Sequence, residues 1–218
     1  MLSKRLIAAW AFFDLCLMGA GVLSLVVSLV WKEDNLLRNL TFSTFNLAIG
    51  TILGIILLAT SLLAVILLIP RATKPLVILN WLLLLDAVAI LFVATSIWIY
   101  TLHERKNYHA VFGRQNDATK ILIQDTLQCC GYFNATDEVA FGGSFCPNQA
   151  AAIVANSFCV NPTVKFADSV LNNVFSTVYG FMAIVIGLFL STMCIMKKRQ
   201  EFERFDKIDA KRGGRGFV

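Results

Sequence analysis

Four long apolar stretches constrain the fold of this 218-residue chain more than any other feature. A helix that crosses about 30 Å of hydrocarbon needs about 20 mostly apolar residues. Inside a bilayer the backbone must satisfy its own hydrogen bonds, so such stretches form helices rather than open strands. The qualifying ranges are 6–30, 46–69, 76–100 and 174–196. We therefore expect an all-α membrane protein with four transmembrane helices.

The composition argues against a soluble helical bundle. Charged residues make up only 15% of the chain and hydrophobic residues 57%, whereas soluble domains contain roughly 25% charged residues. The helices of a soluble bundle would also carry charge along one face, and these stretches do not. The first stretch is longer than the apolar region of a secretory signal peptide and lacks a convincing cleavage site, so we expect it to remain as an anchor.

Basic residues distinguish the two sides of the predicted membrane. An even number of spans leaves segments 1–5, 70–75 and 197–218 on one side, and these hold twelve of the 19 Lys and Arg residues. This bias predicts that both termini are cytoplasmic and that segments 31–45 and 101–173 are extracellular. The net charge of +5 thus reflects membrane topology. A basic face that would bind nucleic acid is not evident.

Segment 101–173 contains four of the six cysteines: Cys129, Cys130, Cys146 and Cys159. In an oxidising compartment, an even number of cysteines in a small domain predicts two disulfides. A zinc site would favour CxxC spacing, which is absent. Adjacent α-carbons lie ~3.8 Å apart, which is too close for an ordinary disulfide, so Cys129 and Cys130 are not expected to pair. Two pairings, crossed and nested, remain.

The arrangement of spans and cysteines resembles that of the tetraspanin family. The resemblance covers nearly the whole chain: four spans, a small first and a large second outer segment, and Cys129-Cys130-Gly131 followed by two more cysteines before the last span. It implies the nested pairing of Cys129 with Cys159 and Cys130 with Cys146. The small number of cysteines and the short loops look more like the fungal branch than the animal branch. Claudin-like four-span proteins differ, since their large loop comes first.

The large outer segment has the signals of short helices. We expect a helix over 102–112 that continues the third span and ends at Gly113, and a second helix capped by Asn116 or Asp117 with Gly131 at its exit. Pro147 favours a short helix over 150–154, and Asn161-Pro162 is typical of a helix start. The range 132–145 shows no helical period. The whole is predicted to be a small disulfide-bonded helical domain with an irregular tip, the shape expected of a recognition surface. The tetraspanin resemblance implies that it binds partners through residues 132–158; a passive spacer is the alternative.

Three residues are candidates for covalent modification. Asn39 and Asn134 lie in N-glycosylation sequons, and Asn134 is the better candidate because Asn39 is close to a span. Cys194 lies just before Lys197 at the predicted inner interface, where S-palmitoylation occurs. A buried apolar role for Cys194 is the alternative.

Small and polar residues inside the spans indicate helix contacts. Stripes that include Gly21, Gly50, Gly54 and Gly187 favour close packing of helices, within the chain or in a homo-oligomer. Asp14, Asp86, Thr60 and Ser61 lie at similar depth, which predicts one polar layer linking spans one, two and three. The alternative is a proton or cation pathway through that layer, although the fourth span offers only Ser191 and Thr192.

The sequence shows no catalytic constellation, metal motif or cofactor motif. Its two histidines, His103 and His109, have no nucleophile or metal-ligand companions nearby in the sequence. The tetraspanin resemblance implies a plasma-membrane organiser that associates laterally with other membrane proteins and with lipids, sterol among them. Its roles would lie in adhesion, trafficking or, in fungi, host penetration and polarised growth. The alternatives are a small transporter or channel and a receptor for an extracellular ligand.

Overall fold

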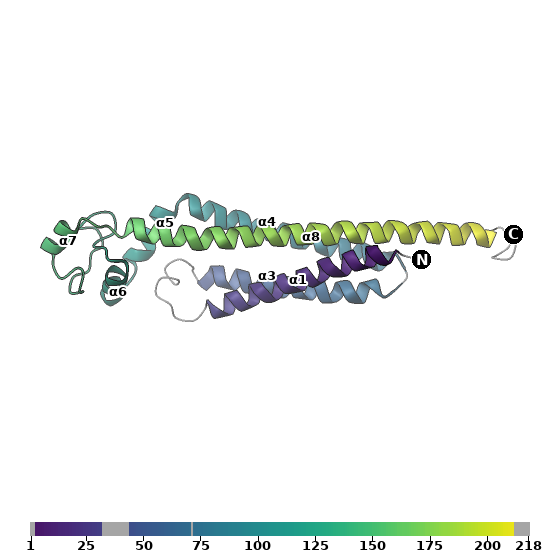
Figure 1. Cartoon of the computed structure of the whole chain (residues 1–218), viewed down its shortest axis with the longest axis horizontal. Coiled ribbons are helices and arrows are strands. Elements are labelled where there is room, and N and C mark those ends of the chain that lie inside the picture. The colour runs from purple at the N-terminus through teal and green to yellow at the C-terminus, as the bar shows by residue number, and fades with distance from the viewer. Residues whose placement is uncertain (1–2, 32–43, 71, 212–218) are drawn as a thin grey trace. The chain divides into compact units, whose positions relative to one another are not determined.

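The computed structural model of the chain describes residues 3–31, 44–70 and 72–211. Within these ranges every regular element is a helix (Figure 1). The helices are α1 (Lys4–Val30), α3 (Thr44–Leu68), α4 (Lys74–Leu102), α5 (Glu104–Gly113), α6 (Asp117–Leu127), α7 (Gln149–Ala155) and α8 (Val160–Lys211).

The predicted set of four apolar helices is confirmed. Among the described residues, α1, α3, α4 and α8 are long and apolar enough to cross a membrane. The first three begin and end within two residues of the expected spans. The fourth helix is much longer than the expected range 174–196, because it extends over 52 residues to Lys211. The residues after 196 contain no helix-breaking Gly or Pro before Gly213 and are rich in strong helix formers, so the helix continues.

The chain divides into two compact units, and the first comprises 1–27, 50–92 and 178–218. It contains most of α1 and α3, the first part of α4 and the last part of α8. Buried leucine, isoleucine and alanine side chains form its interior: Leu17, Ala20, Leu57, Ala64, Leu79, Leu83, Ile90, Leu188 and Ile195. Large apolar side chains also point outward, among them Phe12, Trp81 and Phe92. An apolar exterior of this kind is typical of a surface that contacts lipid.

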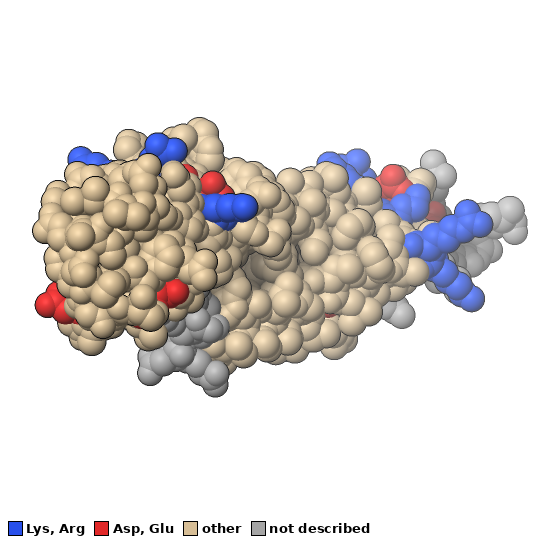
Figure 2. Space-filling view, turned by 60° about the vertical axis from the view of Figure 1, so that its left-hand side comes forward, with Lys and Arg blue, Asp and Glu red and all other residues tan. Residues whose placement is uncertain are grey.

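The charged side chains on the surface of this unit lie mostly away from the apolar outer surface. Figure 2 shows a surface over the apolar helices with almost no Lys, Arg, Asp or Glu, whereas basic side chains gather at the C-terminal end of α8. The described basic residues there are Lys197, Lys198, Arg199, Arg204, Lys207 and Lys211. Charge is therefore excluded from the part of the unit that lipid would surround.

The second unit comprises 28–49 and 93–177. Its main core joins α5, α6 and the first part of α8 through Tyr108, Phe112, Ile123, Cys129, Tyr132, Cys159, Val160, Ala167 and Leu171. A smaller cluster contains Cys130, Cys146 and Ala152. Two neighbouring cysteines thus belong to two different cores.

Several expected helix boundaries within this unit are corrected. The helix expected over 102–112 is interrupted at His103, where α4 ends and α5 begins. The Asn107 side chain donates to the main-chain oxygen of Tyr100 at 3.3 Å and so satisfies a carbonyl near this break. Gly113 is the last residue of α5, with Arg114 as its C-cap.

Some, but not all, ends of the other helices lie where the local sequence predicts them. Asn116, one of the two expected candidates, caps α6 by accepting a hydrogen bond from Thr119 N, and Asn148 caps α7. The exit of α6 is Gln128 in the left-handed region rather than Gly131. α8 begins at Val160, before the expected Asn161-Pro162 start, because Val160 N donates to Tyr132 O at 3.2 Å and needs no side-chain cap.

Candidate functional site

Two disulfides organise the segment between α4 and α8. All six cysteines are described, and the bridges join Cys129 to Cys159 and Cys130 to Cys146, with Cα–Cα distances of 5.0 and 5.8 Å. All four bridged cysteines are buried. The pairing is the nested one that the family resemblance implied. The sulfur atoms are thus bonded to one another, and a Cys-only zinc site is not formed.

Gly131 occupies a turn that no other residue can adopt without strain. Its φ is +69°, and a Cβ atom there would lie 2.1 Å from Asn134 O. Tyr132 N donates to Asp137 O at 2.8 Å, and Cys159 N donates to Gly131 O at 2.9 Å. The glycine therefore lets the chain reverse directly after the two cysteines, next to the start of α8.

Side chains on α6 hold the irregular loop that follows. Asp125 accepts hydrogen bonds from Ser144 N at 3.1 Å and Phe145 N at 2.8 Å. These backbone donors stabilise the carboxylate and lower the pKa of Asp125 below its ordinary value. Gly143 makes the close approach possible, since a Cβ there would lie 2.7 Å from Asp125 Oδ1.

The fully buried Gln124 bridges two parts of the same loop. With its amide oriented to match its neighbours, Gln124 donates to Ala140 O at 2.8 Å and accepts from Gly131 N at 3.0 Å. Because the amide is fully buried, leaving it unpaired would be costly, so these bonds fix the loop against α6.

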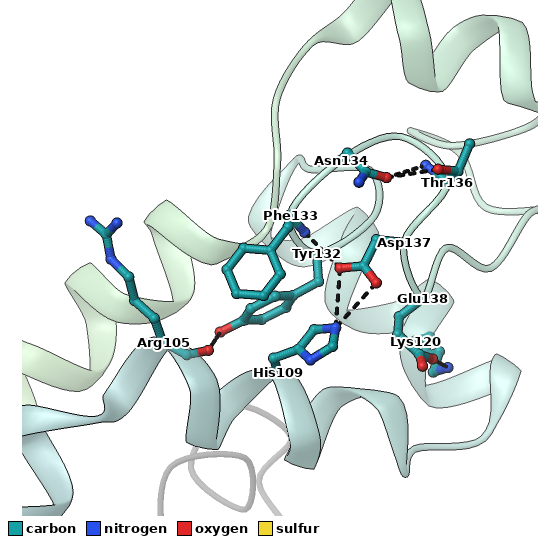
Figure 3. A network of polar contacts seen from close by, with 9 residues as sticks. All are labelled: Arg105, His109, Lys120, Tyr132, Phe133, Asn134, Thr136, Asp137 and Glu138. Carbon is teal, nitrogen blue, oxygen red and sulfur yellow. Dashed lines mark hydrogen bonds and ion pairs between the residues drawn. The ribbon is translucent and has the colours of Figure 1, made fainter.

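A second set of contacts fixes the loop to α5 (Figure 3). His109 Nε2 lies 3.1 Å from Asp137, and Asp137 Oδ2 also accepts from Phe133 N at 3.1 Å. The rings of His109, Tyr132 and Phe133 pack against one another, and each pair of ring centroids lies 4.9 to 5.2 Å apart. The Tyr132 hydroxyl donates to Arg105 O at 3.3 Å. His109 therefore has a packing and pairing role that its isolation in the sequence did not reveal.

A nearly buried lysine completes this side of the loop. Lys120 is 7% exposed, and its Nζ lies 2.5 Å from Glu138 Oε2. The ammonium group also lies 6.0 Å from the centroid of Phe112. The ion pair connects α6 to the residue that follows Asp137, as Figure 3 shows.

The better sequon is exposed and locally ordered. Asn134 Oδ1 accepts hydrogen bonds from Thr136 N at 3.0 Å and Thr136 Oγ1 at 2.8 Å. Both residues are exposed, and Figure 3 shows the contact between them. The other candidate, Asn39, lies outside the described residues.

Exposed apolar side chains mark the outer surface of the candidate recognition segment. They are Phe133, Phe141, Ile153 and Val154, of which Val154 is 84% exposed. Tyr132, the first residue of the expected recognition range, is fully buried and belongs to the core. The accessible part of the range is thus formed by the irregular loop and α7.

The four polar residues expected in one layer lie together in the first unit. Asp14, Asp86, Thr60 and Ser61 are each at least 96% buried. The Ser61 hydroxyl donates to the main-chain oxygen of Asp14 at 3.4 Å, and the Thr60 side chain hydrogen-bonds to the Asp86 side chain. Two consecutive residues of α3 therefore hold aspartates from α1 and α4. Among the described residues, Asp14 Oδ1 and Asp86 Oδ2 have no hydrogen-bond partner.

The small residues allow close approach between helices. A Cβ on Gly21 would lie 2.8 Å from Leu58 Cγ, and one on Gly54 would lie 3.0 Å from Gly21 O. Ser24 Oγ donates to Gly50 O at 2.9 Å, so α1 and α3 are in contact along this stripe. Gly187 on α8 faces the ring of Phe13, which a Cβ would approach to 2.5 Å.

Nothing in the sequence indicated that α8 contacts the turn between α3 and α4. The Arg199 guanidinium donates to the main-chain oxygens of Leu68 and Pro70 at the end of α3. Glu203 accepts from Thr73 Oγ1 at 3.0 Å. A cation near the C-terminal end of a helix is favourable, but the sequence alone does not show that Arg199 meets α3. Cys194, in the same part of α8, is an exposed thiol.

The comparisons with known proteins identify no relative: no family model, curated protein or solved structure matches the chain. Within the described residues, no group of three or more His, Cys, Asp or Glu side chains is arranged to hold a metal ion. The candidate functional site is therefore defined by its own geometry, a disulfide-bonded segment with an exposed apolar surface.

Proposed function

We propose that this protein is a tetraspanin-like membrane organiser that associates laterally with other membrane proteins and presents segment 101–173 as an extracellular recognition domain. The observation that carries the proposal is the construction of this segment between α4 and α8. The nested disulfides and the constrained turn at Gly131 give the Cys-Cys-Gly motif a structural role. The role involves no catalysis or cofactor of the chain's own.

The proposed orientation places both termini in the cytoplasm of a plasma-membrane protein. The basic residues at the C-terminal end of α8 support this side as cytoplasmic. The buried disulfides fit the oxidising exterior, and the exposed Asn134 fits N-glycosylation there. The exposed Cys194 thiol fits palmitoylation near the inner interface.

Topology is tested by glycosylation and protease protection. In intact cells, external protease should cut within 132–158 and leave a tag at the C-terminus intact. Treatment with an N-glycosidase should increase the electrophoretic mobility of the wild-type chain but not of Asn134→Gln. Cleavage of the tag with 132–158 protected would reverse the orientation and overturn the proposal.

We propose that the partners bind through the exposed apolar side chains of the loop and α7. Ile153 and Val154 are 62% and 84% exposed, and contacts to large apolar side chains drive most protein–protein association. Lateral contacts with lipids, sterol among them, and with further copies of the chain would involve the apolar outer surfaces of the helices. Nucleic acid is not a proposed partner.

Partner binding is tested by co-purification in mild detergent with quantitative mass spectrometry. The Ile153→Ser/Val154→Ser variant should lose a defined set of membrane-protein partners by roughly tenfold or more. Phe205→Ser, which changes a residue 62% exposed at the C-terminal end of α8, serves as the control and should retain them. A chain that repeatedly purifies alone would contradict the organiser role.

A transport function is the second candidate, and the unpaired Asp14 Oδ1 and Asp86 Oδ2 atoms favour it. Buried carboxyl groups in membrane helices often mark proton or cation pathways. Reconstitution into proteoliposomes distinguishes the two functions. Proton or cation flux that disappears in Asp14→Asn/Asp86→Asn would establish transport. Flux equal to that of empty vesicles would leave the polar layer with a structural role.

A further inference from the structure

The C-terminal part of α8 carries its basic residues unevenly around the helix. Residues 197–211 contain six Lys and Arg and four Asp and Glu. At 3.6 residues per turn, four of the basic residues fall within about a quarter of the helix circumference, and none of the acidic residues does. We call this side the basic face. Its members are Lys197, Arg204, Lys207 and Lys211, and all four are exposed.

The positive charge of the basic face is not compensated within the chain. Among residues 3–31, 44–70 and 72–211, the structure shows no ion pair of these four side chains, whereas Lys198, outside the face, pairs with Glu201 at 2.7 Å. Arg204, Lys207 and Lys211 follow one another at spacings of three and four residues, so they are neighbours on the helix surface. Like charges at this spacing destabilise a helix, and an anion bound between them would relieve the repulsion.

A different side of the same helix is held against the turn between α3 and α4. The Arg199 guanidinium donates to the main-chain oxygens of Leu68 and Pro70. Glu203 accepts a hydrogen bond from Thr73 Oγ1 at 3.0 Å. These contacts lie about a quarter of a turn around the helix from the basic face. The turn therefore does not cover the basic face, and Figure 2 shows basic side chains projecting from the surface at this end of the first unit.

The basic face begins where the apolar part of α8 ends. Lys197 directly follows Ile195 and Met196, which are buried in the first unit. Arg204 and Lys207 lie ~10 and ~15 Å further along the helix axis, at a rise of 1.5 Å per residue. The Cα–Cβ bonds of a helix tilt towards its N-terminus, so these long side chains can reach back towards the apolar span. They then approach the membrane surface to within about 8 Å, the screening length at physiological ionic strength.

Anionic lipid headgroups match this arrangement in charge and in position. Clusters of Lys and Arg directly after a transmembrane helix attract anionic lipids, and phosphate oxygens accept charge-assisted hydrogen bonds from both side chains. We propose that the basic face binds anionic phospholipid headgroups of the leaflet where α8 leaves the membrane. Phosphoinositides bind most tightly, because their ring phosphates project furthest from the surface. The inference rests on the proposed function only for the assignment of this leaflet to the cytoplasmic side.

Distance from the membrane grades the contributions of the four residues. Lys211 lies ~21 Å beyond Lys197 along the helix axis, which is roughly two to three screening lengths. Arg204 and Lys207 lie closer to the headgroups, so Lys211 contributes least. An acidic protein segment that ran along the whole face would instead use Lys211 as much as Arg204.

Native mass spectrometry of the full chain in detergent micelles with added lipid tests the proposal. The wild type should bind phosphatidylinositol bisphosphate at least roughly tenfold more tightly than phosphatidylcholine, with phosphatidylserine between them. Arg204→Gln/Lys207→Gln should lose roughly tenfold in affinity for phosphatidylinositol bisphosphate, and Arg204→Lys/Lys207→Arg should keep the wild-type affinity. Lys211→Gln should change it by less than about twofold.

The matched control is Lys106→Gln/Lys165→Gln, which removes the same amount of charge from exposed positions of the second unit and should leave the affinity unchanged. Equal affinity of the wild type for the bisphosphate lipid and for phosphatidylcholine would overturn the proposal. Wild-type affinity in Arg204→Gln/Lys207→Gln would do the same. Displacement of the lipid by an equal concentration of free inositol trisphosphate or of a polyglutamate peptide would also overturn it, because the basic face would then bind a soluble anion.

The result does not depend on the organiser function. The lipid measurement uses the purified chain alone, so it needs neither protein partners nor a particular orientation in a cell. Failure of the co-purification experiment would contradict the organiser function and leave the lipid affinity as it is. Failure of the lipid measurement would leave the exposed apolar side chains of α7 and their proposed partners unaffected.

Discussion

A Cβ atom placed on Gly131 would lie 2.1 Å from the main-chain oxygen of Asn134. No flexible side chain can move to relieve this overlap, because the contacted atom belongs to the backbone. Gly131 also has a φ of +69°, which side chains other than glycine adopt only with strain. The third residue of the Cys-Cys-Gly motif is therefore fixed by the turn that brings Cys159 next to it.

We expect Gly131→Ala to destabilise the second unit by about 3 kcal/mol, the sum of left-handed strain and overpacking. Gly142→Ala is the matched control. Its φ is also positive, at +110°, but the nearest atom to its Cβ is 3.9 Å away, so backbone strain alone should lower the free energy of unfolding, by about 1–2 kcal/mol. Thermal unfolding of the purified chain, followed by near-UV circular dichroism, measures both. Equal losses of stability in the two variants would mean that the close approach of Gly131 to Asn134 O does not matter.

The two disulfides should protect different regions. Removing the pair Cys130–Cys146 opens the smaller cluster and should expose 133–158 to proteases while α5 and α6 stay protected. Removing Cys129–Cys159 disrupts the main core and should expose both regions. In the chain-entropy model the bridges contribute about 3 and 3.5 kcal/mol, because they close loops of 16 and 30 residues. Limited proteolysis with peptide mapping, applied to the variants in which one or the other cysteine pair is replaced by serine, shows which regions each disulfide protects. Identical cleavage patterns would contradict the prediction.

Two glycine substitutions in the apolar helices should act in opposite directions. Gly54→Ala forces α1 and α3 apart and should destabilise the first unit by about 1–2 kcal/mol. Gly19→Ala meets no atom within 4 Å and should stabilise α1 by up to about 1 kcal/mol, since alanine favours helix. Melting temperatures in one detergent provide the comparison. An unchanged or higher melting temperature for Gly54→Ala would mean that the α1–α3 contact does not require glycine.

Removing the negative charge that pairs with Lys120 should lower the stability of the folded chain. Glu138→Gln leaves the ammonium group of Lys120, a residue only 7% exposed, without its negative partner. We expect the free energy of unfolding to fall by about 1–2 kcal/mol. The matched control is Glu201→Gln, which breaks an exposed pair with Lys198 and should change stability by less than about 0.5 kcal/mol. Chemical unfolding monitored at equilibrium gives both values. If the Glu138 and Glu201 variants were equally stable, the Lys120 pair would have no special role.

The apolar helices and the cysteine framework could be predicted because their signals are local or topological. Hydropathy located α1, α3 and α4 within two residues. The glycine spacing on spans one and two predicted a stripe whose members, Gly21 and Gly54, do face each other.

The remaining features depend on contacts between segments distant in the sequence. Nothing near Arg199 in the chain indicates that its side chain will contact the end of α3. The start of α8 was misplaced for the same reason. Asn161-Pro162 is a good local start signal, but the hydrogen bond from Val160 N to Tyr132 O allows the helix to begin earlier.

The placement of Cys129 and Cys130 in separate clusters makes the disulfide-bonded segment modular. One peptide unit separates a base, built on α5, α6 and α8, from an outer lobe that has its own disulfide. Replacements of the exposed side chains of Ile153 and Val154 can change the surface of the lobe while the Cys129–Cys159 base keeps its packing. The outer surface of the segment can thus change through a short stretch of sequence without rebuilding the main core.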